Sequence, residues 1–170
     1  MRLGLGFVVL FALGARGEVI DASASGFLVR RVVTIGVSPS EVYQGITDIS
    51  KWWESAHTFS GNARNLSLGA KAGGCFCESL PPDGEVRHMT VVYAAPGKLL
   101  RMTGALGPMQ SAGVSGTMTF ELKPAESGTE VTLSYSVGGY FQGGLASMAG
   151  PVDSVLKAQL AGLKAFLERK

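Results

Sequence analysis

Residues 150–170, with the sequence GPVDSVLKAQLAGLKAFLERK, decide the fold. Gly150-Pro151 predicts that a helix begins here, because proline suits the first helical position, where its missing N–H is no loss. The apolar residues that follow recur at helical spacing and form one stripe: Val152, Val155, Leu156, Leu160, Leu163, Phe166 and Leu167. Asp153 in the first turn and the basic residues at the end suit the helix dipole. Such a helix needs an apolar surface to lie against, and a curved antiparallel sheet supplies one.

Short strands precede this helix. In residues 114–122 and 131–137, apolar and polar residues alternate, which predicts two antiparallel strands, each with one buried and one wet face. A valine-rich stretch at 27–37 predicts the first strand, and Pro81-Pro82-Asp83-Gly84 is a turn signal. The remaining strands are expected at 65–68, 72–80, 85–94 and 98–104.

Two short helices are expected after the first strand. Ser38 provides a helix cap and Pro39 the first helical position. Residues 49–53, which contain Trp52 and Trp53, predict the second short helix. The predicted order is a strand, two short helices, about six strands and a long helix.

This order and several motifs resemble the SRPBCC or START-like helix-grip superfamily, which includes the birch-pollen-allergen-like proteins, and in particular its polyketide cyclase/dehydrase-like branch. The motifs are SPSEVY at 38–43, ITDISKWW at 46–53, GGCFCE at 73–78, YAAPGKLL at 93–100 and the C-terminal helix. The resemblance covers nearly all of residues 27–169. It implies an α+β helix-grip fold, in which a curved antiparallel sheet of about six or seven strands wraps around the long C-terminal helix.

The first residues predict export. Residues 3–15 carry no charge after a basic start at Arg2, and Ala15-Arg16-Gly17 offers the small residues that signal peptidase reads. The uncharged run is shorter than the ~20 residues that span a bilayer, which favours a cleaved signal peptide over a membrane anchor. We expect cleavage after Gly17, although Ala22-Ser23-Ala24 also fits the small-x-small pattern.

The expected organisation is a signal peptide at 1–17, a short N-terminal extension at 18–26 and a single domain at 27–170. The mature protein is then expected to be periplasmic or secreted, without a stable membrane span. The superfamily also includes relatives of heat-shock ATPase activators, which are cytosolic. Export of this protein argues against a role as an ATPase co-chaperone.

Charge argues against nucleic acid as a partner. Without Arg2 and Arg16, the 15 lysines and arginines fall to 13, which equals the 13 aspartates and glutamates. A neutral chain without basic clusters lacks the electrostatic footprint that binds phosphates.

The resemblance implies a cavity between the long helix and the sheet, with residues 52–59 near one mouth. One tryptophan of Trp52 and Trp53 is expected in the core and the other at this mouth. Tyr135 is a firm candidate because its strand has a clear buried parity. The candidate ligand-binding residues are Trp52, Trp53, His57, Phe59, Met118, Phe120, Tyr135, Tyr140, Leu156, Leu160 and Leu163.

Cys75 and Cys77 are the only cysteines and are separated by one residue. In a regular strand they share a face with Cβ atoms ~7 Å apart, too far for a disulfide unless the strand bends. We therefore favour two small side chains that fill one face of the sheet, and expect no cofactor. The alternative is a redox pair, or a soft-metal site with His57 and His88.

Three functions follow. The leading hypothesis is an exported carrier that holds a small apolar or amphipathic ligand, such as a lipid or a polyketide-like molecule. The alternative is a cyclase or dehydratase that uses the same cavity, with His57, Glu78 or a tyrosine as acid or base. No catalytic signature is present in the sequence, and the direction in which Glu78 points stays open. The third is a thiol-based metal or redox protein.

Overall fold

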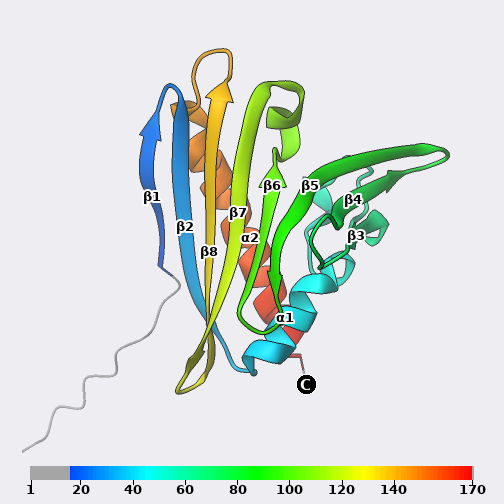
Figure 1. Cartoon of the computed structure of the whole chain (residues 1–170), viewed down its shortest axis with the longest axis vertical. Coiled ribbons are helices and arrows are strands. Elements are labelled where there is room, and N and C mark those ends of the chain that lie inside the picture. Colours follow the sequence, from blue (N-terminus) through cyan, green and yellow to red (C-terminus); the bar gives the residue numbers. More distant parts are fainter. Residues whose placement is uncertain (1–15, 170) are drawn as a thin grey trace, which may run out of the picture.

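A computed structural model describes residues 16–169 and shows one antiparallel sheet wrapped around a long helix (Figure 1). The strands follow the order β1-β2-β8-β7-β6-β5-β4-β3, and every neighbouring pair is antiparallel. Their bounds are β1 Arg16–Ser23, β2 Gly26–Ile35, β3 Leu66–Leu68, β4 Cys75–Leu80, β5 Gly84–Ala95, β6 Leu99–Gly104, β7 Gly113–Ala125 and β8 Gly128–Tyr140. The predicted α+β helix-grip fold is confirmed.

The sheet has eight strands, one more than the upper expected number. The additional strand is β1, which pairs with β2 at one edge of the sheet and contains most of the predicted extension. The predicted signal peptide lies almost entirely in residues 1–15, outside the described residues. Within the described residues, no helix is long and apolar enough to cross a membrane.

Helix α1 (Pro39–Thr47) begins with the predicted cap. The Ser38 hydroxyl accepts from the Glu41 N–H at 3.4 Å, and the Glu41 carboxylate accepts from the Ser38 N–H at 2.9 Å. This capping box satisfies two backbone donors at the start of the helix. The segment predicted as a second short helix contains only a 3₁₀ turn, η1 (Ile49–Lys51). Two more, η2 (Ser55–His57) and η3 (Ala63–Asn65), follow before β3, and η4 (Gly107–Ser111) joins β6 to β7.

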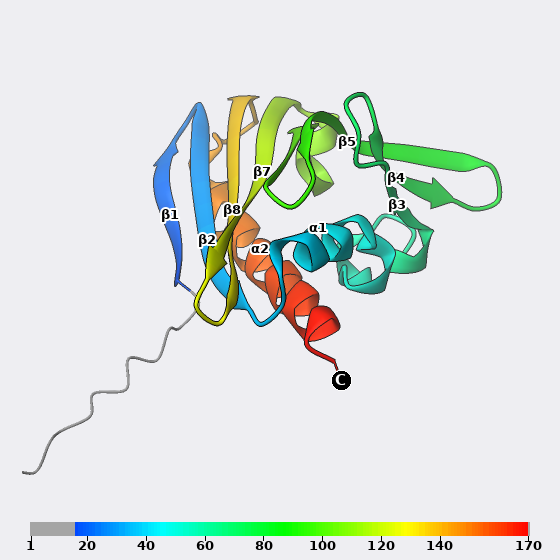
Figure 2. The ribbon, with the colours of Figure 1, turned by 60° about the horizontal axis from the view of Figure 1, so that its bottom comes forward.

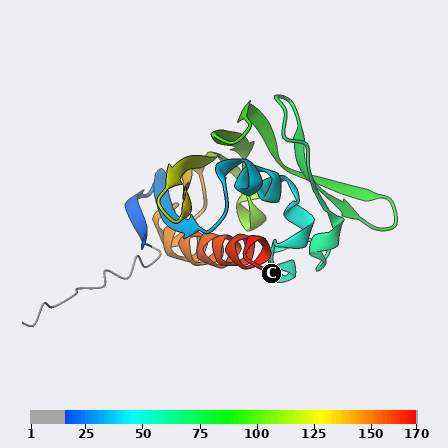
Figure 3. The same cartoon turned by 90° about the horizontal axis from the view of Figure 1, so that it is seen from below.

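Helix α2 (Ala146–Leu167) lies along the concave side of the sheet, as the view from below shows (Figure 3). The predicted helix start at Pro151 is wrong, because the helix begins five residues earlier and Pro151 lies inside it. An interior proline removes one helical hydrogen bond. The start of the helix is fixed by Leu145, the residue just before it. Leu145 is fully buried and donates its N–H to the Ala24 carbonyl at 3.0 Å.

Polar contacts fix α2 against β2 along its length. Arg31 donates two hydrogen bonds to Asp153, and both side chains are largely buried. Asp153 was expected to serve the helix dipole in the first turn; it lies in the second turn and binds this arginine instead. At the other end, Lys164 donates to the Thr34 carbonyl, and Glu168 accepts from the Gly36 N–H at 2.9 Å. These contacts hold α2 against β2, and Figure 2 shows the helix lying behind the sheet.

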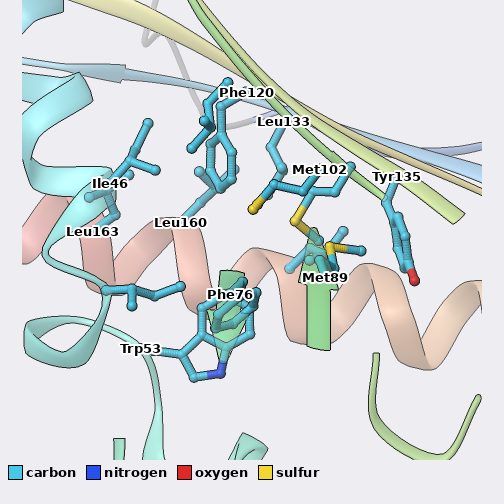
Figure 4. Close-up of a cluster of buried hydrophobic side chains, with 14 of the residues drawn as sticks. Ile46, Trp53, Phe76, Met89, Met102, Phe120, Leu133, Tyr135, Leu160 and Leu163 are labelled. Carbon is cyan, nitrogen blue, oxygen red and sulfur yellow. The ribbon is translucent and has the colours of Figure 1, made fainter. Parts of the chain in front are cut away.

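The middle of the interior is filled with side chains (Figure 4). Residues of the sheet and of α1 meet residues of α2 there, and all are nearly inaccessible to solvent: Ile46, Met89, Met102, Met118, Phe120, Leu133, Leu160 and Leu163. Tyr135 closes one side, where its hydroxyl donates to the Gly104 carbonyl and accepts from the Leu106 N–H. Burial raises the pKa of Tyr135 to about 12, so this tyrosine stays protonated.

Gly162 lets α2 approach the segment that carries the tryptophans. A Cβ at this position would lie 2.5 Å from the Trp52 carbonyl oxygen. In an unhindered helix, glycine to alanine gains about 0.5–1 kcal/mol. We expect Gly162→Ala to lower the free energy of unfolding by about 1 kcal/mol or more, because overpacking outweighs that gain.

Urea denaturation checks this expectation, with Ser154→Ala, at an exposed position of the same helix, as the control. The control should change the free energy of unfolding by less than about 0.5 kcal/mol. A Gly162→Ala variant more stable than the wild type would contradict the close approach.

Candidate functional site

A cavity of about 450 Å³ lies between α2 and one end of the sheet. Four segments line it: Trp53 with residues 56–59, the sheet residues Phe76 and His88, the β6–β7 connection at 106–109, and α2. The helix contributes Met148, Pro151, Val152, Val155 and Leu156. Nearly all of these side chains are apolar, and the polar ones are Thr58 and the two histidines. The volume and the composition are typical of a site for one small apolar molecule.

Four of the predicted ligand-binding residues line this cavity, namely Trp53, His57, Phe59 and Leu156. Six others are buried outside its lining, in the core: Trp52, Met118, Phe120, Tyr135, Leu160 and Leu163. Tyr140 is 75% exposed and lies outside the lining too. The buried parity of a strand predicts which side chains face inward, but not whether the interior at that point is filled or hollow.

The two tryptophans have different surroundings. Trp52 donates its indole N–H to the Gly45 carbonyl at 2.8 Å and belongs to the core. Trp53 packs against Phe76, with ring centroids 5.4 Å apart, and forms part of the cavity wall. Its indole N–H donates to the His57 carbonyl at 3.0 Å and holds the 3₁₀ turn that carries His57.

Glu78 and His88 form a buried pair behind the wall. The Glu78 side chain is fully buried and does not line the cavity, whereas His88 does. His88 Nε2 lies 2.9 Å from Glu78 Oε2. The same carboxylate accepts from the Phe59 N–H at 3.1 Å and from the Ser60 N–H. Glu78 therefore joins β4, β5 and the loop at the cavity mouth.

A β-bulge directs His88 inward. Phe76 pairs with Met89 and Cys77 with Arg87, so His88 is the extra residue of β5. Consecutive residues of a regular strand point to opposite faces, but a bulge breaks that alternation and re-aims one side chain. His88 and Met89 are consequently both buried. Strand parity could not predict the bulge, so the sequence analysis named His88 only as a ligand of the alternative metal site.

The protonation states of the pair follow from its contacts. Burial raises the pKa of Glu78, but the hydrogen bonds from Ser60, Phe59 and His88 together lower it below its ordinary value of 4.5. Burial lowers the pKa of His88 below 6.5 and outweighs Glu78, which raises it. At neutral pH the pair is therefore a carboxylate and a neutral imidazole, with the imidazole proton on Nε2, between the ring and the carboxylate.

Gln159 positions His57. The Gln159 side chain is buried on α2, and its Oε1 accepts from the Glu54 N–H at 2.9 Å. That bond orients the amide, so Nε2 is the atom that lies 3.0 Å from His57 Nδ1 and donates to it. The neutral His57 ring then carries its proton on Nε2. Glu54 Oε2 also lies 3.1 Å from His57 Nδ1.

Cys75 and Cys77 form a disulfide, which corrects the expectation of two free thiols. Their Cα atoms lie 5.3 Å apart, closer than the ~7 Å of a regular strand. The bend that a disulfide needs is therefore present at Phe76. With both sulfurs in this bond, the thiolates of the alternative metal site with His57 and His88 are not available in this structure.

Comparisons with known proteins agree with this architecture. The family model described as polyketide cyclase/dehydrase and lipid transport matches residues 27–168. No curated protein matches the chain in sequence. Among solved structures, protein MLL2253 of Mesorhizobium loti is 18% identical with a TM-score of 0.62, over 84% of this chain and 98% of its own. A protein of Rhizobium leguminosarum is 16% identical with a TM-score of 0.62, over 92% and 99%. These likenesses show the fold.

Proposed function

Because the chain belongs to the polyketide cyclase/dehydrase and lipid transport family, we propose that its cavity binds one small apolar or amphipathic molecule, either a lipid or a compact aromatic of the polyketide kind. The observation that carries the proposal is the apolar cavity of about 450 Å³ with two histidines in its wall. A ligand in such a cavity is bound because its apolar surface is buried, and the few polar groups of the wall fix its orientation.

We propose further that the protein acts as a carrier in the periplasm or outside the cell. The charge-free run at residues 3–15 supports export. The Cys75–Cys77 disulfide supports it as well, because disulfides persist in oxidising compartments. Catalysis of the cyclase or dehydratase type in the same cavity is a second candidate function. The pair of Glu78 and His88 favours it.

Filling the cavity tests the binding function. We expect Val155→Trp to weaken binding of the fluorescent apolar amine N-phenyl-1-naphthylamine about tenfold or more, because the indole occupies the space of the ligand. Fluorescence titration of the purified protein measures the dissociation constant.

The matched control is Val92→Trp, which places the same side chain at an exposed position of β5 outside the cavity. It should leave the dissociation constant within about twofold of the wild type. Equal affinity in all three proteins would show that the amine binds elsewhere, and would contradict the proposed site.

A further inference from the structure

His88 presents one unengaged nitrogen in the wall of an apolar cavity. Its Nε2 is held by Glu78, whereas its Nδ1 has no hydrogen-bond partner within residues 16–169. The residue as a whole is buried, but its Nδ1 is not sealed from solvent. The residue also lines the cavity. Of the two ring nitrogens, Nδ1 is therefore the one left free for a molecule bound in the cavity. Since the proton is on Nε2, Nδ1 presents a lone pair.

The imidazole is held in place by its neighbours. Phe59 stacks on it with centroids 5.7 Å apart and an interplanar angle of 17°. Phe76 packs against it at 4.9 Å. With Glu78 on Nε2, the ring has little freedom to turn. An imidazole that is oriented by a carboxylate on one nitrogen can accept a proton on the other, and the carboxylate then stabilises the imidazolium.

The cavity also holds a hydrogen-bond donor. His57 lines the same cavity, and its Nδ1 accepts from Gln159. The ring proton is therefore on Nε2, which can donate a hydrogen bond. A base and a donor in one apolar pocket match a ligand with an acidic C–H bond beside an oxygen that gains negative charge.

We propose that His88 is a general base that removes a proton from the carbon next to the carbonyl of a bound apolar ketone, with Glu78 as its positioning residue. In this step the C–H bond breaks, its electron pair forms the enolate, and the proton joins His88 Nδ1. His57 Nε2–H donates to the enolate oxygen. The reverse step returns a proton to the same carbon, so the reaction needs no further reactant. This inference rests on the proposed binding function.

Hydrogen exchange of 2-tetralone in D₂O tests the proposal. This bicyclic apolar ketone has exchangeable protons beside its carbonyl, and ¹H NMR follows their replacement by deuterium. We expect the wild-type protein to accelerate the exchange about 100-fold or more over an equal concentration of free imidazole. His88→Gln should remove that acceleration while the variant keeps the circular dichroism spectrum of the folded wild type and still binds N-phenyl-1-naphthylamine, because glutamine keeps a polar side chain but has no base.

The role of Glu78 has its own signature. Glu78→Gln should slow the exchange about tenfold or more and move the acid limb of the pH profile to lower pH, because a neutral amide no longer stabilises the imidazolium. Glu85→Gln makes the same chemical change at an exposed position of β5, outside the cavity. It should leave the exchange rate and the pH profile unchanged. In the wild type the exchange should decline as the pH falls through the pKa of His88, which lies below 6.5.

The outcomes separate the two proposals. Exchange no faster than with free imidazole, or equal exchange in the wild type and His88→Gln, would overturn the role of His88. The proposed function would still stand if the wild-type protein binds the fluorescent amine. A pH profile unmoved by Glu78→Gln would overturn the positioning role. Failure of both 2-tetralone and the amine to bind the wild-type protein would overturn the proposed function itself.

Discussion

Replacing Glu78 with alanine lowers the free energy of unfolding by about 3 kcal/mol or more, because each hydrogen-bond donor left without an acceptor costs roughly 1–3 kcal/mol. The carboxylate is fully buried and accepts hydrogen bonds from His88, Phe59 and Ser60. Without it, three buried or half-buried donors lose their acceptor, and the loop at the cavity mouth loses its attachment to the sheet. Urea denaturation at pH 7 measures the loss.

Glu85→Ala is the control, because it removes the same side chain from an exposed position of β5 and should change the free energy of unfolding by less than about 0.5 kcal/mol. The pH dependence provides a second check. Because the folded pKa of Glu78 is lower than 4.5, its contribution is present above pH 4.5 and is lost as the pH falls through the folded pKa. The alanine variant should lack this acid component. A loss below about 1 kcal/mol would contradict the anchoring role.

Truncation of Leu163 to alanine costs about 3–4 kcal/mol and leaves ligand affinity unchanged. Leu163 is fully buried where α2 packs on the filled part of the interior (Figure 4). Deleting its branched end creates a void among close-packed neighbours, which lose both hydrophobic burial and dispersion contacts. The expected loss is therefore at the upper end of what single substitutions produce.

Leu106→Ala is the matched variant for the hollow part of the interior. Leu106 is only partly buried and lines the cavity, so the same truncation enlarges a space that already exists. It should cost about 1–2 kcal/mol and change the affinity for N-phenyl-1-naphthylamine. Thermal or urea denaturation and fluorescence titration check both variants. Equal destabilisation by the two truncations, with affinity altered only by Leu163→Ala, would contradict the placement of the cavity.

Local patterns predicted most of the fold. The alternation in residues 114–122 and 131–137 is confirmed by β7 and β8, in which alternate apolar side chains are buried: Met118, Phe120 and Leu122 in β7, and Val131, Leu133, Tyr135 and Val137 in β8. The capping signal at Ser38 is confirmed as well. These features follow from residues that are close in sequence, and their periods of two and 3.6 are fixed by backbone geometry. The start of α2 was missed because packing of Leu145 outweighed the local signal of Pro151.

The candidate site depended on features that no local pattern contains. His88 points inward because β5 carries one extra residue against β4, and the disulfide forms because β4 bends at Phe76. Both result from the pairing of strands. Glu78 was named from the sequence, but its partners Phe59 and Ser60 come from a loop some 20 residues earlier. The aromatic cluster at Trp53, His57 and Phe59 was placed at the cavity because of the family resemblance.

The most direct test of the cavity is the set of intermolecular nuclear Overhauser effects between bound N-phenyl-1-naphthylamine and assigned side chains. The structure predicts contacts from ligand protons to Val155, Met109 and the His88 ring, which line the cavity from three different segments. Contacts confined to Phe120, Leu133 and Leu163 in the filled core, or to the exposed Tyr140, would contradict it.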